Sequence, residues 1–246
     1  MDEMSFKDLT AVSVLARSMG SELAHQIGRC IATGHYAPGS LIEDESALVS
    51  RYGVSRTVVR DAVKVLVGKG LLEVRRGIGT RVKPREQWAL FDLDVLAWQL
   101  SAQADPTMLL QLMEIRQLFE PQAAAWAAKR ATASDIAEIL SALEAMSADV
   151  ANMELFLKAD ARFHRAVLRA AHNEYLFALS GIIYSSLLSI IRLHNPDVGN
   201  NRRIVSFHRD VHDAIAAGNE VDASLKMAFL IEDASSRIKA STALAS

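Results

Sequence analysis

The chain has 246 residues, half of them hydrophobic and 23% charged, which is the composition of a globular protein and excludes an intrinsically disordered one. No apolar run approaches the ~18 residues that a membrane span needs, and Met1–Thr10 lack the apolar stretch of a secretory signal, so we expect a cytoplasmic protein. The net charge of −2 combines a basic part, Met1–Arg85 with 13 basic and 9 acidic side chains, and an acidic part, Glu86–Ser246 with 14 and 20. This division suits a nucleic-acid reader joined to a domain that does not contact phosphates.

The first predicted helix spans Val12–Thr33, where apolar residues recur at spacings of three and four. The single cysteine, Cys30, lies on this apolar stripe and is expected to be a buried, inert thiol. Gly34 ends the helix, and His35–Ser40 reads as a turn because it contains Pro and Gly. A short second helix follows over Glu45–Tyr52.

The next elements complete a small DNA-binding fold. Gly53 makes a tight turn, and Ser55 can cap a third helix because its hydroxyl accepts a hydrogen bond from the first turn. That helix ends near Gly68–Gly70. The run Leu71–Val82 places two β-prone segments around a glycine-bearing turn, which predicts a hairpin. Residues 1–83 are therefore predicted to form a winged helix-turn-helix.

The rest of the chain is predicted to be all-α, so the fold class is mainly α. Residues 84–104 are interpreted as a linker and a connecting helix, and residues 105–246 as a helical bundle for effector binding and dimerisation. Thr132 and Asp135 have the spacing of a capping box, and Gly199 reads as a helix breaker. The predicted helices are Leu90–Ala102, Pro106–Ala131, Ser134–Ala148, Met153–Ala171, Glu174–Leu193, Arg202–Ala217 and Val221–Ala240.

The third helix carries candidate DNA contacts. Arg56 and Arg60 are four residues apart and therefore share one face near the helix N-terminus, the end that enters the major groove. An arginine fork can bond guanine O6 and N7 together or grip a phosphate. The alternative is that both arginines only pair with Asp61 or Glu45 on a solvated face. The other candidate DNA contacts are Ser46, Ser55, Thr57, Lys64, Arg75, Arg76 and Gly77.

Residues 53–62, Gly-Val-Ser-Arg-Thr-Val-Val-Arg-Asp-Ala, followed by Gly70-Leu71-Leu72 and the hairpin, resemble the GntR family of bacterial regulators. The resemblance implies that Arg56 and Arg60 contact double-stranded operator DNA and that Gly77 of the wing approaches it. Ser46 stands where relatives often have arginine, so the base preference is expected to differ.

Two helices of the second half carry candidate metal ligands. Asp160 and His164 lie one helical turn apart on one face, and His208 begins a later polar stretch. A carboxylate with imidazoles is the ligand set that suits zinc, nickel or manganese, although such an Asp-x-x-x-His is more often a surface pair. His212, one turn after His208, is interpreted as a hydrogen-bonded surface histidine.

The second half resembles the ligand-binding (FCD) domain of the FadR branch of the same family, through the runs around Glu114-Ile115-Arg116, Asp160-x-x-x-His164 and His208–Gly218. Metal-binding members of that branch use one Asp and three His. Three of these match here, whereas the fourth position falls on Leu230, which cannot bind a metal. An effector carboxylate and water could complete the shell, so the resemblance leaves divalent metal binding open.

The same resemblance implies that Arg116 faces the effector pocket and pairs with an acidic ligand. The alternative is a buried pair with Glu120, four residues on. Ser185, Ser186 and Arg192 lie on a helix expected beside the pocket and are weaker effector candidates.

A longer run, which includes Gln87-Trp88, Asp92-x-Asp94 and Glu120-Pro121, resembles regulators of sugar-acid catabolism within this branch and implies a galactonate-like aldonate as effector. We therefore expect a homodimeric repressor that its acidic effector releases from DNA. The alternatives are a metal-dependent enzyme acting on a small carboxylate, which lacks a distinctive catalytic motif, and a DNA-binding protein without an effector. Trp88 and Trp98 read equally well as core residues and as interdomain anchors.

Overall fold

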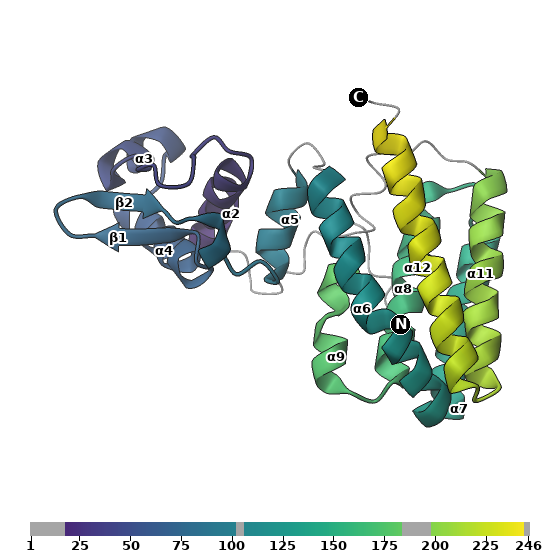
Figure 1. The fold of residues 1–246 in the computed structure, drawn as a ribbon. Coiled ribbons are helices and arrows are strands. Elements are labelled where there is room, and N and C mark those ends of the chain that lie inside the picture. The colour runs from purple at the N-terminus through teal and green to yellow at the C-terminus, as the bar shows by residue number, and fades with distance from the viewer. Residues whose placement is uncertain (1–17, 102–105, 184–197, 244–246) are drawn as a thin grey trace. The chain divides into compact units, whose positions relative to one another are not determined.

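The computed structural model describes residues 18–101, 106–183 and 198–243, and the chain divides into two compact units, Met1–Gln103 and Ala104–Ser246 (Figure 1). The fold is mainly α with one small sheet, which confirms the predicted fold class. None of the helices within the described ranges combines the length and the apolar composition required to span a bilayer.

The first unit is a winged helix-turn-helix followed by one more helix. Side-chain oxygens of Ser18, Asp44 and Ser55 cap its first three helices, each accepting a hydrogen bond from a first-turn amide. The helix predicted over Val12–Thr33 begins instead at Met19, because Ser18 is extended and caps it, and residues 12–17 lie outside the described residues. The elements are α2 (Met19–Ala32), α3 (Glu45–Tyr52), α4 (Arg56–Gly68), β1 (Leu72–Arg75), β2 (Gly79–Val82), a 3-10 turn (Arg85–Gln87) and α5 (Leu93–Ser101).

The helix-turn-helix and the wing match the predicted elements closely. Gly53 ends α3 in the left-handed region with φ of 64°, a conformation that glycine adopts without steric cost. Strands β1 and β2 pair antiparallel, with Leu72 opposite Val82 and Arg75 opposite Gly79. Leu23, Ile27, Leu48 and Leu66 are among the apolar side chains that pack between the helices.

The segment after the wing belongs to this unit. The Trp88 indole donates to the carbonyl oxygen of Lys83 at 2.9 Å, and the Trp98 indole donates to Nδ1 of His25 at 2.8 Å. Both tryptophan side chains are buried, and the ring of Trp98 lies against Gly28. Residues 84–101 thus include core residues of the N-terminal unit, and both tryptophans act as core anchors there.

The second unit is a helical bundle in which α6 packs against α8 and α12, and α11 packs against α7 and α12 (Figure 1). Thr132 and Asp135 form the predicted capping box at the start of α7. The elements are α6 (Pro106–Arg130), α7 (Ala133–Ala148), α8 (Met153–Ala170), α9 (Glu174–Ala178), α11 (Val198–Ala216) and α12 (Glu220–Ala243).

Two helix predictions for this unit need correction. Gly199, expected to break a helix, lies in the first turn of α11, which begins at Val198 rather than at Arg202. The single long helix predicted from Glu174 is interrupted, because α9 ends at Ala178 and Leu179 forms a turn before helical residues 180–183. A glycine disfavours the helix interior by only about 1 kcal/mol relative to alanine, which is too little to set a boundary by itself.

Candidate functional site

The exposed face of α4 carries the two arginines predicted to read DNA. Apolar residues such as Val59 and Ala62 face the core, so the helix period directs Arg56 and Arg60 outward, with 69% and 65% of their side chains exposed. Nε of Arg60 lies 2.7 Å from Oε2 of Glu45 on α3, and Nε of Arg56 lies 4.0 Å from Oε1 of the same carboxylate. The arginines are therefore both paired with Glu45 and accessible to a ligand.

These contacts perturb the titration of Glu45 and Arg60. The hydrogen bond from Arg60 lowers the pKa of Glu45, and the same bond raises the pKa of Arg60. Glu45 and Arg60 are thus both charged at neutral pH. The single carboxylate of Glu45 faces two guanidinium groups, those of Arg60 and Arg56.

The remaining candidate DNA contacts also lie on the surface of the first unit. The Ser55 hydroxyl accepts a hydrogen bond from the Val58 amide at 3.3 Å, so this side chain has a structural role as helix cap. Lys64 pairs with Asp61 at 3.2 Å. The other exposed candidates are Ser46, Thr57, Arg75, Arg76 and Gly77, of which Arg75 pairs with Glu73 at 2.9 Å and Gly77 occupies the left-handed region.

The second unit buries the three predicted metal ligands together. Asp160 and His164 come from α8, His208 comes from α11, and all three are buried. Oδ1 of Asp160 lies 2.8 Å from Nε2 of His208 and 3.3 Å from Nε2 of His164, and the two Nε2 atoms are 3.3 Å apart. Among the described residues this is the one group of His, Cys, Asp or Glu found to have metal-site geometry.

The hydrogen bonds around the two histidines favour a cation at their centre. Nδ1 of His208 donates to the carbonyl oxygen of Ile204 at 2.8 Å, so this nitrogen carries a proton. In the neutral ring Nε2 is then an acceptor, and it faces a carboxylate oxygen, also an acceptor. Either a second proton or a metal ion must lie between them.

The spacing of the ligand atoms fits a metal ion as well. Atoms about 2.1 Å from a shared ion lie about 3.0–3.4 Å apart in octahedral or tetrahedral geometry, close to the separations observed between Asp160, His164 and His208. Partners on the far side of each imidazole, as here, fix the tautomer that exposes Nε2. The residues present therefore fit a divalent metal.

Glu120 extends this cluster in a way that the sequence did not reveal. One carboxylate oxygen contacts Nδ1 of His164, and the other lies 2.5 Å from Nε of Arg116. The i,i+4 spacing predicts the ion pair with Arg116, but the contact with His164 depends on the packing of α6 on α8. Arg116 is thus buried in an ion pair with Glu120, which was the alternative to an effector contact. Glu120 in turn links it to His164 of the metal-type group, Asp160, His164 and His208.

Charge holds these buried groups ionised. Burial by itself raises the pKa of Glu120, but the charges of Arg116 and His164 lower it to about 2. The pKa of Asp160 is likewise lowered by hydrogen bonds from both histidines, against the effect of burial. Burial lowers the pKa of His164, but the charge of Glu120 and the hydrogen bonds to Asp160 and Glu120 together raise it.

Among the described residues, neither Leu230 nor His212 belongs to the metal-type group of Asp160, His164 and His208. Leu230 is buried in α12 and offers no metal ligand. His212, expected at the surface, is instead only 8% exposed, with Nδ1 2.8 Å from Oδ1 of Asp213. The effector candidates Ser185, Ser186 and Arg192 lie outside the described residues.

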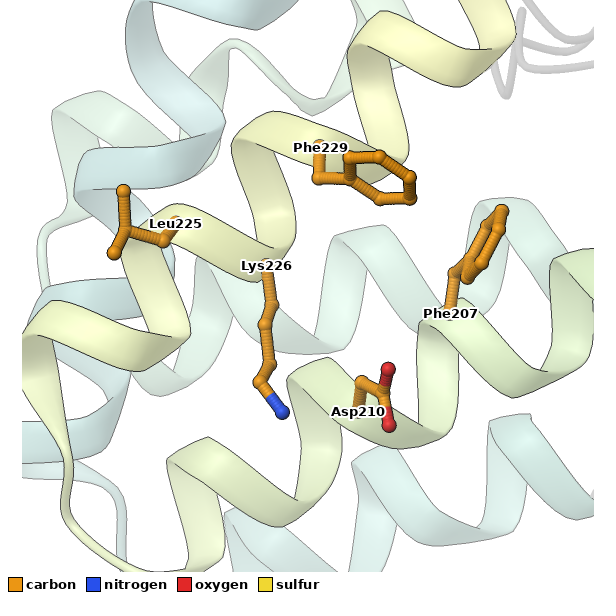
Figure 2. Close-up of a pocket in the computed structure, with 5 residues that line it drawn as sticks. All are labelled: Phe207, Asp210, Leu225, Lys226 and Phe229. Carbon is orange, nitrogen blue, oxygen red and sulfur yellow. The ribbon is translucent and has the colours of Figure 1, made fainter.

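A surface pocket of about 150 Å³ lies between α11 and α12 (Figure 2). Phe207, Phe229 and Leu225 form its apolar lining, and Asp210 and Lys226 contribute one charge of each sign. None of Asp160, His164 and His208 lines this pocket. It is therefore distinct from the buried cluster.

Family comparisons agree with both halves of the structure. Residues 20–82 match the bacterial regulatory proteins of the gntR family, and residues 111–233 match the FCD domain. The chain belongs to the GntR family. It is 40% identical to the galactonate operon transcriptional repressor of Escherichia coli K12 over 77% of this chain and 83% of that one. It is also 33% identical to the regulator LutR of Bacillus subtilis 168, over 80% of this chain and 90% of that one.

Solved structures show the same fold at low sequence identity. The structure of Lar, which is described as controlling expression of the Listeria monocytogenes agr system, superposes with a TM-score of 0.65 at 17% identity, covering 91% of this chain and 97% of that one. The matched families and the curated relatives named above are regulators of transcription rather than enzymes. The chain is therefore a DNA-binding transcriptional regulator, and its FCD unit contains a buried group able to hold a metal ion.

Proposed function

We propose that this regulator is a homodimeric repressor of sugar-acid catabolism genes, released from its operator by an acidic sugar derivative such as a galactonate-like aldonate. The observation that carries the proposal is the buried group Asp160, His164 and His208, backed by Glu120 and Arg116. Burying this many charged groups costs free energy even when they pair with one another. Such a buried charged cluster is therefore a candidate functional site. Similarity to a galactonate operon repressor supports the effector class.

Asp160, His164 and His208 would hold a divalent ion such as zinc, nickel or manganese. With neutral histidines, the two carboxylates of the cluster outweigh the single guanidinium by one negative charge. A bound divalent ion would reverse the sign of this charge and supply a positive centre that attracts the effector carboxylate. Arg116, linked to the group through Glu120, would add a second positive charge, and Glu120 would keep its guanidinium oriented. Ser185, Ser186 and Arg192 remain candidates for the hydroxyl groups of the effector.

A thermal-shift measurement tests the effector and metal assignments. We expect galactonate or a related aldonate to raise the melting temperature when zinc, nickel or manganese is present, and galactose, which lacks the carboxylate, to have no effect. A metal at 100 times its dissociation constant stabilises the fold by about 2.7 kcal/mol. A chelator and the variant His208→Asn should each abolish this gain. The matched control His172→Asn, at an exposed histidine of the same unit, should retain it. A metal-induced gain that survives in His208→Asn would contradict the assignment.

On the DNA side, Arg56 and Arg60 would read base edges, and Thr57, Lys64, Arg75 and Arg76 would hold phosphates, with Ser46, Ser55 and Gly77 close to the backbone. Two-fold symmetry would present two recognition helices to successive half-sites. Binding of the effector would favour an arrangement of the DNA-binding domains with lower operator affinity.

Anisotropy titration against a duplex that the parent protein selects from a randomised library tests this assignment. We expect Arg60→Ala to lose operator binding while it retains the aldonate-induced thermal shift. Equal operator binding by the variant and the parent would refute the role of the recognition helix. Sedimentation of the parent protein should give the mass of a dimer. A monomer that binds the operator with full affinity would refute the proposal that a two-fold symmetric dimer binds two half-sites.

A further inference from the structure

Glu45 occupies a place that the DNA-binding role of the arginines does not explain. It is an acid at the first position of α3, on the surface expected to face a polyanion, and it contacts both Arg60 and Arg56. An acidic side chain there weakens the attraction for DNA phosphates. Its place in the first turn of α3 suits the helix dipole, but that does not account for its contacts with the two arginines, which point to a second role.

The atoms in contact suggest that advantage. Oε2 of Glu45 accepts a hydrogen bond from Nε of Arg60, the inner N–H of the guanidinium, at 2.7 Å. The bond engages Nε, so the end of the guanidinium formed by its two terminal amino groups remains available as the planar fork that bonds guanine O6 and N7 together. An exposed arginine without such a partner samples many rotamers and must be ordered when DNA binds.

We propose that Glu45 is a positioning residue that holds Arg60 ready for base reading and thereby exchanges non-specific affinity for sequence discrimination. This inference rests on the proposed function of Arg60 as a DNA contact. The distances assign the main effect to Arg60 and a smaller one to Arg56, whose Nε is 4.0 Å from the same carboxylate. The opposite possibility is that Glu45 acts only as a repulsive charge. Its removal would then tighten binding to every DNA alike.

The experiment compares two duplexes, the one selected by the parent from a randomised library and a shuffled duplex of the same composition. Dissociation constants for both are measured by anisotropy at several salt concentrations, because affinity for DNA depends steeply on salt. The test variant is Glu45→Gln, which keeps the size of the side chain, removes its charge and leaves only a neutral acceptor, whose hydrogen bond with Arg60 is roughly half as strong. The matched control is Asp61→Asn, which removes one negative charge from α4 at a residue that pairs with Lys64 and not with the two arginines. Melting curves verify that each variant folds.

We expect Glu45→Gln to bind the shuffled duplex about 2-fold more tightly and the selected duplex more weakly, so that the ratio of the two affinities falls by about 10-fold, within the range that one bidentate base contact provides. Asp61→Asn should tighten both and leave the ratio unchanged. In an Arg56→Ala background Glu45→Gln should still lower the ratio, whereas in an Arg60→Lys background, which has no guanidinium fork, it should not.

An unchanged ratio in Glu45→Gln would overturn the proposal and leave Glu45 as a repulsive charge. A fall of equal size in the Arg60→Lys background would also overturn it, because Glu45 would then not act through Arg60. Failure of the underlying function would look different. In that case Arg60→Ala itself would bind the selected duplex like the parent.

Discussion

The two units of this regulator handle charge in opposite ways. The N-terminal unit places its functional charges on the surface, where Arg56 and Arg60 pair with Glu45 while most of each arginine side chain stays in water. The C-terminal unit buries the charges of its candidate site, and Arg116 and Glu120 are 2% and 1% exposed. Exposed pairs contribute little to stability because water and salt screen them, whereas a buried charge that loses its partner is severely destabilising. The first arrangement suits a surface that must exchange its partners for DNA, and the second suits a site that holds a small charged ligand.

Removing one carboxylate from each unit tests this difference most strongly. Glu120→Ala should lower the free energy of unfolding by about 3–5 kcal/mol, because it removes a buried carboxylate that pairs with Arg116 and contacts His164. Glu45→Ala should leave the free energy of unfolding close to that of the parent. Urea unfolding, with a chelator present to remove the contribution of any metal, measures both. Equal losses in the two variants would show that burial does not separate the units.

Packing, rather than charge, should then dominate the stability of the N-terminal unit. A Cβ added at Gly28 would lie 2.5 Å from the ring of Trp98, so Gly28→Ala should destabilise the unit by about 1–3 kcal/mol as its core is overpacked. Gly68, in the last turn of α4, has nothing within 4 Å of such a Cβ. Gly68→Ala should instead stabilise the unit by about 0.5–1 kcal/mol, since alanine favours helix. Thermal unfolding of both variants checks the pair, and a stabilising Gly28→Ala would show that Trp98 moves aside without cost.

The sequence was a better guide to the exposed surface than to the buried cluster. Helix periodicity alone predicted that Arg56 and Arg60 face outward, because the apolar residues between them must face the core. Asp160 and His164 followed from the spacing of one helical turn. Their meeting with His208 was expected from resemblance to relatives, and the structure brings the three together.

The parts that could not be predicted depend on tertiary packing. Glu120 reaches His164 only because α6 packs on α8, and no local pattern specifies that crossing. Helix spacing already disfavours Asp61, which directly follows Arg60 on α4, whereas the contact of Glu45 with the arginines depends on how α3 packs on α4. The buried position of His212 follows from the packing of α11 and was interpreted wrongly from its polarity.

Asp135 offers an intermediate case that separates burial from location. It lies in the C-terminal unit, but its side chain is 14% exposed, and it closes the capping box with Thr132 and pairs with His172 at 2.9 Å. Asp135→Ala should cost about 1 kcal/mol, the typical value of a helix cap and far less than the loss of Glu120. If Asp135→Ala cost as much as Glu120→Ala, the position of a carboxylate in this unit would matter more than its burial.

The pH dependence gives this last prediction a second readout. Burial by itself raises the pKa of Asp135, but hydrogen bonds from Thr132 and His172 outweigh burial and lower it. A carboxyl whose pKa is lower in the folded than in the unfolded state stabilises the fold fully above the unfolded pKa, about 4 for Asp. That contribution is lost as the pH falls through the folded pKa. The difference between parent and Asp135→Ala in urea unfolding should therefore be constant near pH 7 and shrink below pH ~4. A difference independent of pH would mean that the cap acts through its geometry alone, and the small cost of the variant would then say nothing about charge.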